Sequence, residues 1–378
     1  MAKKSDKASR SGKTPAKGQK ASSSGEPKRS AASKGSAGRK ISAKPKADAK
    51  PKGSAKPKSS AKPKGSAKAR GTAAGPRVVA TAPDRAAAVE QLSHRGAPAL
   101  TPATVADLLR VGPGFDLASV DPGSTPGFVG DHDDADRALA EGAERLSDLQ
   151  ERLFAAAKGG DQRRVLLVVQ GMDTSGKGGI VRHVVGAVDP QGVNHTAFKA
   201  PTPVERAHDF LWRIRQALPG AGEIGVFDRS HYEDVLVVRV HDLVPRAVWA
   251  RRYATINRFE AGLAAKGTTL VKVMLHVSPQ EQKARLEERL NRPDKYWKYN
   301  PRDLDERALW PAYQEAYQAA LTKCSTEAAP WYVVPADHKW YARWAVQHLL
   351  LAALEAIDPQ WPAADFDVEA ELARLAHS

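Results

Sequence analysis

A glycine-rich loop at 171–179, with the sequence Gly-Met-Asp-Thr-Ser-Gly-Lys-Gly-Gly, constrains this chain more than any other feature. The apolar run 165–169 before it is typical of a strand buried on both faces of a sheet, and a helical pattern follows the loop. Gly171, Gly176 and Lys177 match the phosphate-binding pattern G-x-x-x-x-G-K-[S/T]. Such a loop turns backbone N–H groups toward phosphate oxygens, and its lysine adds a point charge. The predicted phosphate-binding residues are Gly171, Thr174, Ser175, Gly176, Lys177, Gly178 and Gly179.

The loop departs from this pattern at Gly178, where Ser or Thr normally holds a magnesium ion. Another oxygen must replace that hydroxyl, and Asp173 inside the loop is the candidate. A carboxylate here would repel bound phosphates unless a metal ion lay between them. We therefore expect Asp173 to act through Mg²⁺, with Mn²⁺ as an alternative. The other interpretation is that Asp173 accepts a hydrogen bond from a loop amide.

A second carboxylate, Asp228, ends the apolar segment 224–227. It occupies the position at which P-loop enzymes complete the metal site. Its neighbour Arg229 is placed to balance charge on a transferred phosphoryl group, or alternatively forms a structural ion pair. The predicted catalytic residues are Asp173, Lys177, Asp228 and Arg229, with Asp173 and Asp228 as metal ligands.

Alternating strand and helix patterns predict the fold class. Apolar runs predict strands at 165–169, 224–227, 270–277 and 331–334, with a weaker candidate at 193–198. Helical patterns lie at 134–158, 178–188, 203–217, 245–265, 279–291 and 301–323, the last with a kink at Pro311. This alternation favours an α/β fold, a parallel sheet between two layers of helices. The Pro-, Gly- and Asp-rich segment 96–135 is expected to wrap the surface.

Six basic residues lie in and after the predicted helix 279–291. They are Arg285, Arg289, Arg292, Lys295, Lys298 and Arg302, and the three arginines that come first share one helix face. P-loop kinases close a helical arm over bound phosphates, so these residues are candidates for a lid at about 279–311, although the pattern alone favours the alternative. The alternative is a solvated helix face whose charges pair with Glu287 and Glu288.

Residues 1–85 differ from the rest of the chain in composition. Residues 1–70 hold 22 Lys and Arg against three acidic residues, a net charge of +19, so the remainder carries −4 of the total of +15. The near absence of large apolar side chains predicts a disordered tail over 1–85 and a folded domain over 86–378. A six-residue A-K-P-K repeat at 43–66 spreads lysines along an extended chain. The tail either binds a polyanion through counterion release or only keeps the protein soluble.

The remaining composition indicates the compartment. A single cysteine, Cys324, provides no disulfide framework and fits a reducing environment. No apolar run approaches the roughly 18 residues that span a membrane. The lysine-rich N-terminus lacks the apolar core of a secretory signal. We expect a cytoplasmic protein without a membrane partner.

Longer strings of sequence resemble the polyphosphate kinase 2 family over about 96–350. The strings are V-Q-G-M-D-T-S-G-K-G-G from Val169, A-P-T-P from Ala200, H-D-F-L-W-R from His208, F-D-R-S-H-Y-E-D-V-L-V-V-R-V from Phe227, W-K-Y-N-P from Trp297, S-T-E-A-A-P-W-Y-V-V-P-A-D from Ser325 and K-W-Y from Lys339. Members of that family move phosphoryl groups between inorganic polyphosphate and nucleotides with magnesium. The resemblance implies a thymidylate-kinase-like α/β/α sandwich with a helical lid.

The resemblance also implies roles for the loop residues. Asp173 and Asp228 would act on metals and phosphates, and Lys177 and Arg229 would contact the phosphoryl groups. The six basic lid residues would contact polyphosphate. The family has the same Asp in its loop and lacks the hydroxyl, so the departure at Gly178 is expected.

Substrates and partners follow from the same resemblance. The string from His231 resembles the branch that accepts nucleoside monophosphates, or both mono- and diphosphates, so Glu233 and Asp234 are candidate acceptor-selectivity residues. The expected partners are polyphosphate, ADP and AMP, with GDP as a further acceptor, and a second copy of the chain in a homo-oligomer. The basic tail would add DNA or polyphosphate, with nucleoid or polyphosphate-granule association.

Two other functions stay open at this point. An ATP-dependent small-molecule kinase would share the loop, although such enzymes usually keep the Ser or Thr that is missing here. A nucleoid or polyanion-binding protein would act through the tail, although the intact Asp173, Lys177 and Asp228 argue for catalysis.

Overall fold

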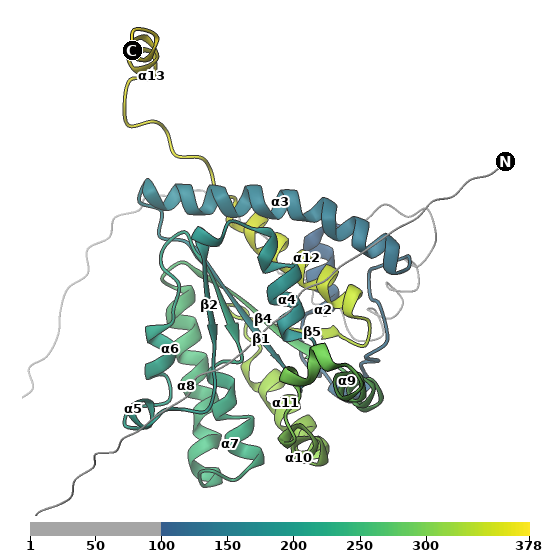
Figure 1. The fold of residues 1–378 in the computed structure, drawn as a ribbon. Coiled ribbons are helices and arrows are strands. Elements are labelled where there is room, and N and C mark those ends of the chain that lie inside the picture. Colours follow the sequence, from purple (N-terminus) through teal and green to yellow (C-terminus); the bar gives the residue numbers. More distant parts are fainter. Residues whose placement is uncertain (1–99) are drawn as a thin grey trace, which may run out of the picture. The chain divides into compact units, whose positions relative to one another are not determined.

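A five-stranded parallel sheet lies at the centre of the described region, residues 100–378 of this computed structural model (Figure 1). The strands are β1 (Arg164–Gly171), β2 (Val193–Ala197), β3 (Ile224–Asp228), β4 (Thr268–His276) and β5 (Trp331–Pro335). Their order is β2-β3-β1-β4-β5, and each neighbouring pair is parallel. All five predicted strands are confirmed. The predicted tail at 1–85 and the domain start at 86 lie outside the described residues.

Helices cover both faces of the sheet. One layer contains α2 (Pro102–Leu109), α3 (His132–Lys158), α4 (Lys177–His183) and α12 (Lys339–Ile357). The other contains α6 (Trp212–Gln216), α8 (Arg246–Ala264) and α11 (Trp310–Cys324). Along β1, Val165 and Leu167 enter the first core, whereas Leu166 and Val168 enter the second. Burial on both faces explains the continuous apolar sequence, and the predicted α/β/α sandwich is confirmed.

Two predicted helices are each divided into two α-helices in the structure. The segment 203–217 forms α5 (Pro203–Arg206) and α6, and 301–323 forms α10 (Arg302–Ala308) and α11. Leu309 separates the second pair. Pro311 lies in the first turn of α11, where a missing backbone N–H leaves no bond unmade. The prediction of one helix kinked at Pro311 was therefore wrong.

The segment 96–135 contributes more to the core than its composition indicated. Thr101 caps α2, and Val105 and Leu109 of that helix are buried in the first core. The backbone N–H of Val111 donates to the carbonyl oxygen of Trp331 at 2.8 Å, which ties this segment to the start of β5. Part of the segment therefore belongs to the hydrophobic core and does not only cover the surface.

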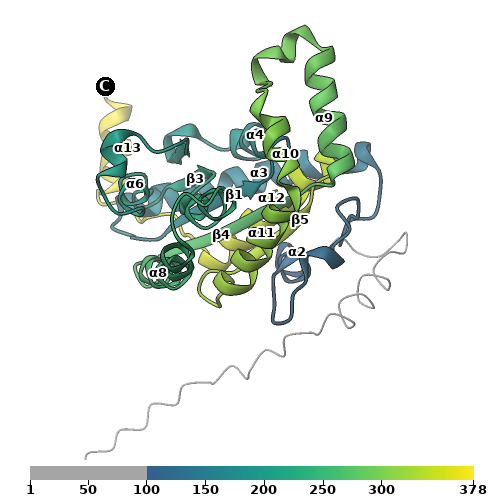
Figure 2. The same ribbon diagram turned by 90° about the horizontal axis from the view of Figure 1, so that it is seen from below.

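An arm leaves the body at the carboxyl end of β4 (Figure 2). It consists of α9 (Pro279–Asn291), the 3₁₀ turn η5 (Pro293–Lys298) and α10. The hydroxyl of Ser278 accepts a hydrogen bond from the N–H of Glu281 at 3.0 Å and begins α9. The glycine-rich loop follows the carboxyl end of β1, beside β4, so the arm rises next to the loop.

Short elements complete the described region. They are η1 (Leu117–Ser119), η2 (Val185–Ala187), η3 (Pro190–Gly192), η4 (His231–Asp234), α7 (Val237–Val240) and α13 (Val368–Ala376). The predicted helix 178–188 is α4 followed by η2. Over residues 100–378, every helix is too short or too polar to span a membrane.

Candidate active site

The loop between β1 and α4 requires glycine at two positions. Gly171 has φ 155°, and a Cβ there would lie 2.8 Å from the carbonyl oxygen of Leu275. Gly176 has φ 111° and precedes α4 without a side-chain cap. The hydroxyl oxygens of Thr174 and Ser175 are buried without a hydrogen-bond partner among the described residues. A bound phosphate would supply the missing partners.

Lys177 begins α4 and turns back over the loop. Its Nζ donates to the carbonyl oxygens of Gly171 (2.8 Å) and Met172 (3.2 Å), which uses two of its three N–H donors. Burial lowers the pKa of Lys177, and the carboxylates of Asp173 and Asp228 oppose that shift. The ammonium therefore lies among the predicted catalytic carboxylates.

Asp228 and Arg229 reach the loop because β3 pairs with β1. The register places Asp228 opposite Val169, two residues before the loop begins. Arg229 has φ 64°, and its Nη2 lies 3.2 Å from Oδ1 of Asp173. The structure thus brings Asp173, Lys177, Asp228 and Arg229 together, as the sequence predicted, and it also gives Arg229 the ion pair that was the alternative.

Two cavities open on either side of the loop. The first, about 650 Å³, is bounded by the loop from Asp173 onward, the arm and the start of α12; we call it the lid cavity. The second, about 570 Å³, is bounded by η4, α7 and α11; we call it the η4 cavity. Asp173 and Asp303 line both cavities. Two separate ligands can therefore approach the same loop.

The predicted lid residues do not all face one cavity. Arg289, Lys295 and Lys298 line the lid cavity, whereas Arg302 lines the η4 cavity. Arg292 lies outside both sets of lining residues and forms ion pairs with Glu288 and Asp294. The six residues therefore do not line one common cavity, and their contact with polyphosphate stays a prediction.

Arg285 lines the lid cavity but is only 4% exposed. Its Nη1 donates to the carbonyl oxygen of Thr174 at 2.9 Å. Its Nη2 donates to the carbonyl oxygens of Ala336 (2.6 Å) and Asp337 (2.9 Å), and its Nε bonds Glu281. These contacts join the base of the arm to the loop. The guanidinium of Arg285 is thus engaged in hydrogen bonds within the protein, whereas the sequence predicted that it would contact polyphosphate.

Glu233 and Asp234 lie in η4 and line the η4 cavity. Burial raises the pKa of Glu233, although Arg229 and Lys177 partly oppose the shift. Asp234 is held by Arg252, whose Nη1 lies 2.8 Å from its Oδ1. The two acidic side chains are therefore positioned differently: Glu233 faces the catalytic cluster, and Asp234 is anchored to α8.

Several lining residues were not singled out from the sequence. They are Arg182, His183, Lys339 and Arg343 in the lid cavity, and Tyr313 and Tyr317 in the η4 cavity, together with Asp303. Lys339 and Arg343 come from α12, far from the loop in sequence. The K-W-Y string at 339–341 was a signal for Lys339, whereas the others lack a local pattern.

The two carboxylates fit a magnesium ion. Mg²⁺ in phosphate-transfer sites usually takes one or two protein carboxylates and keeps water and substrate phosphates as its other ligands. Asp173 and Asp228 provide such a pair beside Lys177. Within residues 100–378, no group of three or more His, Cys, Asp or Glu forms a metal cage. An ion held by Asp173 and Asp228 would take its other ligands from water and from phosphate oxygens.

Comparisons with known proteins connect this chain to one family. The model of the polyphosphate kinase 2 family matches residues 130–362. The AMP/ADP-polyphosphate phosphotransferase of Meiothermus ruber is 49% identical over 248 residues, covering 66% of this chain and 91% of that protein. The ADP-polyphosphate phosphotransferase of Rhodopseudomonas palustris is 43% identical over 231 residues, covering 58% of this chain and 78% of that protein. A solved structure of polyphosphate kinase 2 from Arthrobacter aurescens TC1 is 58% identical, with a TM-score of 0.72, and covers 74% of this chain and 98% of its own.

Proposed function

The chain belongs to the polyphosphate kinase 2 family, and from this we propose that it transfers phosphoryl groups between inorganic polyphosphate and nucleoside mono- or diphosphates. One observation carries the assignment of the site: the lid cavity and the η4 cavity meet at Asp173, next to Lys177. A donor in one cavity and an acceptor in the other would present their reacting phosphates to the same loop.

The lid cavity suits the polyphosphate chain. Basic side chains from three elements line it: Arg182 of α4, Arg289, Lys295 and Lys298 of the arm, and Lys339 and Arg343 of α12. A linear polyanion needs a series of cations rather than a shaped apolar pocket. The distribution of charge along this cavity supports donor binding here.

The η4 cavity suits the nucleotide. Apolar side chains contribute to its wall, namely Phe198, Leu236, Val237 and Leu243, and Arg206, Arg213 and Arg229 lie among them. A nucleotide combines a flat apolar base with an anionic phosphate end, so it needs both kinds of surface. This mixture supports acceptor binding on this side of the loop.

The chemistry requires neutralisation of charge more than proton removal. The second pKa of a phosphate is about 6, so the acceptor oxygen is largely ionised near neutral pH. Lys177 and Arg229 would offset the mutual repulsion of the two anions and hold their phosphates in line. Asp173 and Asp228 would hold Mg²⁺, or Mn²⁺ in its place, which adds positive charge between the phosphates. A general base such as a kinase needs for an alcohol is not required.

The acceptor range is the finer part of the proposal. We propose that both AMP and ADP are phosphorylated, with GDP as a further acceptor, and that Glu233 and Asp234 affect the choice. The support is the position of both residues in the η4 cavity and the similarity to the AMP/ADP-polyphosphate phosphotransferase of Meiothermus ruber, which is 49% identical. Initial rates with polyphosphate and AMP, ADP or GDP test it. Phosphorylation of ADP alone would contradict the proposed range.

Substitution of Lys177 tests the assignment of the site. Lys177→Ala should lower the rate of ATP formation from polyphosphate and ADP by about 100-fold or more, because a preorganised charge next to the reacting phosphate is lost. Lys283→Ala is the matched control, since Lys283 lies on the exposed face of α9, forms an ion pair with Glu287 and lines neither cavity. A Lys177→Ala rate close to that of the control would refute the role of the loop.

Three further expectations concern the whole protein. We propose a cytoplasmic location, a homo-oligomer, and binding of DNA or polyphosphate by the basic tail, with nucleoid or granule association as the consequence. The single cysteine fits the proposed location, and the charge of +19 over residues 1–70 supports binding of a polyanion by the tail. Light scattering tests the oligomer, and binding of labelled DNA in competition with polyphosphate tests the tail. A monomer, or equal binding by protein without its tail, would contradict the respective proposal.

A further inference from the structure

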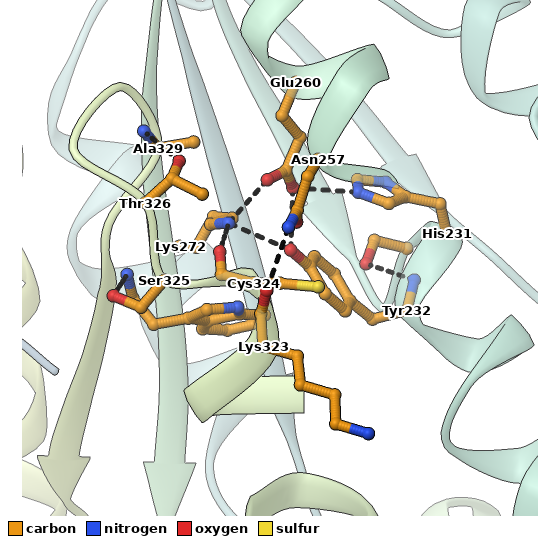
Figure 3. A network of polar contacts seen from close by, with 12 residues as sticks. His231, Tyr232, Asn257, Glu260, Lys272, Lys323, Cys324, Ser325, Thr326 and Ala329 are labelled. Atoms are coloured by element: carbon orange, nitrogen blue, oxygen red, sulfur yellow. Dashed lines mark hydrogen bonds and ion pairs between the residues drawn. The ribbon is translucent and has the colours of Figure 1, made fainter. Parts of the chain in front are cut away.

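A buried polar network lies behind the η4 turn (Figure 3). It consists of the side chains of His231, Tyr232, Glu260 and Lys272, together with the carbonyl oxygen of Cys324. Each of the four side chains is 0% exposed. The network does not line either cavity, so the proposed chemistry does not use it.

Lys272 joins three elements to the centre of the sheet. Its Nζ donates to the hydroxyl of Tyr232 (2.9 Å), to Oε2 of Glu260 (2.6 Å) and to the carbonyl oxygen of Cys324 (2.7 Å). These three acceptors belong to η4, to α8 and to the last residue of α11. All three donors of the ammonium are thus used, each in a different direction.

Glu260 completes the network from α8. Its Oε1 accepts from the hydroxyl of Tyr232 (2.8 Å) and lies 3.0 Å from Nε2 of His231. Burial alone would raise the pKa of Glu260, but the charge of Lys272 and the bond from His231 lower it below its ordinary value. The carboxylate is therefore ionised and holds two consecutive residues of η4.

The network residues of η4 are adjacent in sequence to residues that line the η4 cavity. His231 and Tyr232 point inward, while the next two residues, Glu233 and Asp234, line the η4 cavity. The opposite end of the network is Cys324, and the same helix α11 carries Tyr313 and Tyr317 of the cavity wall. One lysine thus connects two walls of the η4 cavity.

Stability alone gives little reason for a charged pair in this place. Lys272 lies in the middle of β4, between Val271 and Val273, where an apolar side chain would also pack. Moving two charges out of water is costly, and replacing a buried pair by apolar residues is often neutral or stabilising. The hydrogen bonds of the charged pair are directional, so they orient η4 relative to α8 and α11.

We propose that Glu260 and Lys272 are positioning residues for the nucleotide acceptor. They fix the position of η4 relative to α11 and do not affect the binding of polyphosphate. This inference rests on the proposed function, since it assigns the acceptor to the η4 cavity. The loss of the network should therefore weaken nucleotide binding selectively. A residue that only maintains the fold would alter both substrates or neither.

The test is the double variant Glu260→Gln, Lys272→Met. It removes both charges together, so no ion is left buried without its partner, and it removes the hydrogen bonds from Lys272 to Tyr232 and to Cys324, which join η4 to α11. We expect the KM for ADP to rise about tenfold, because a small shift of the wall of the η4 cavity greatly weakens nucleotide binding. The KM for polyphosphate should stay within about twofold of that of the unaltered protein. The melting temperature should stay close to that of the unaltered protein.

The matched control is Gln347→Met. Gln347 is 0% exposed and donates to the carbonyl oxygen of Leu139 at 2.8 Å, so its loss also removes a buried polar contact, between α12 and α3. Neither KM should change in this control. Equal increases in both KM values of the double variant, or no increase in either, would overturn the proposal.

One further variant and one binding measurement complete the test of the positioning role. If the double variant does not fold, Tyr232→Phe removes only the hydroxyl through which Tyr232 contacts Lys272 and Glu260, and it should show the same selective rise in the KM for ADP, of about threefold. Absence of this rise contradicts the inference. Calorimetric titration with ADP separates this inference from the proposed function. An unaltered protein that binds ADP but transfers no phosphate would sink the proposed function, whereas unweakened ADP binding by the variant would sink the positioning role.

Discussion

At the scale of single residues, Thr174 and Arg229 share an unusual feature, a left-handed backbone with φ 64°. Such a conformation in a non-glycine residue costs on the order of 1–3 kcal/mol and persists only where neighbouring contacts hold it. The carbonyl oxygen of Thr174 accepts from Arg285, and the N–H of Arg229 donates to the carbonyl oxygen of Val169. The glycine spacing predicted the loop, but it contains no signal for these two conformations. They place Arg229 within 3.2 Å of Asp173.

The role of Asp173 as a metal ligand leads to a prediction about magnesium. Asp173→Asn should lower turnover by about 100-fold and raise the magnesium concentration required for half-maximal rate, because an amide is a weaker ligand than a carboxylate. Asp209→Asn is the control, since Asp209 forms an exposed ion pair with Arg215 away from the loop. Magnesium titrations of initial rates measure both. An unchanged titration for Asp173→Asn would leave the amide-capping interpretation as the better one.

The raised pKa of Glu233 predicts a pH-dependent stability. A carboxyl group whose pKa is higher in the folded state stabilises the fold fully below its unfolded pKa, and that stabilisation is lost as the pH rises through the folded pKa. Glu233→Gln mimics the neutral form, so at neutral pH it should be more stable than the unaltered protein. The difference should shrink as the pH falls toward the ordinary value of 4.5. Urea unfolding between about pH 5 and pH 8 measures it.

The control for this experiment is Glu315→Gln, because Glu315 is exposed on α11. Its unfolding free energy should follow that of the unaltered protein at every pH. A Glu233→Gln variant that is no more stable at neutral pH, or whose advantage grows in acid, would show that the burial of Glu233 does not perturb its titration.

At the scale of elements, the arm shows what periodicity can predict and what it cannot. The helix 279–291 was predicted with the bounds that α9 has, because its apolar and charged positions repeat at helical spacing. The same spacing placed Arg285 and Arg292 on one face but could not show that the loop 336–337 covers Arg285. That contact joins residues about 50 positions apart, and only the folded chain brings them together. The sequence therefore predicts the element and not its burial.

Glu288 of α9 pairs with two cations of the lid cavity, Lys295 and Lys339, that would otherwise be available to polyphosphate. It forms ion pairs with Lys295, with Arg292 at 3.3 Å and with Lys339 at 3.8 Å, and it lines the lid cavity. Glu288→Gln should therefore lower the KM for polyphosphate by about threefold, a small change because each exposed pair contributes only about 0–1 kcal/mol. Rates against polyphosphate concentration measure it.

The control for Glu288 is its neighbour. Glu287→Gln removes the same charge from the same helix, but Glu287 pairs with Lys283 outside the lid cavity. Its KM for polyphosphate should stay unchanged. A decrease of equal size in both variants would indicate a general effect of net charge and not competition for the cavity cations.

At the scale of the whole molecule, the sheet order explains how a site forms from distant segments. The order β2-β3-β1-β4-β5 puts β1 at the centre, so the loop after it has β3 on one side and β4 on the other. Asp228 arrives with β3, and the arm arrives with β4. The sequence predicted each of these segments separately. The two cavities could not be predicted in the same way, because Lys339 and Arg343 reach the loop only through the packing of α12 on the sheet.

The basic tail differs from the rest of the chain in its net charge. Residues 1–70 carry +19, whereas the rest of the chain carries −4. The electrostatic attraction between the protein and a polyanion should therefore come mainly from the tail. Replacing the eight lysines of the repeats at 43–66 with Gln should raise the KM for long polyphosphate by about tenfold at low salt and flatten its salt dependence, because fewer counterions are released on binding. The KM for short chains and for nucleotides should stay unchanged, since the lid and η4 cavities are intact. Initial rates with long and short chains over a series of salt concentrations measure this, and replacement of the lysines by Arg is the control that keeps the charge. If Gln and Arg variants behave alike, the tail does not deliver polyphosphate to the lid cavity, and DNA is the polyanion to test in its place.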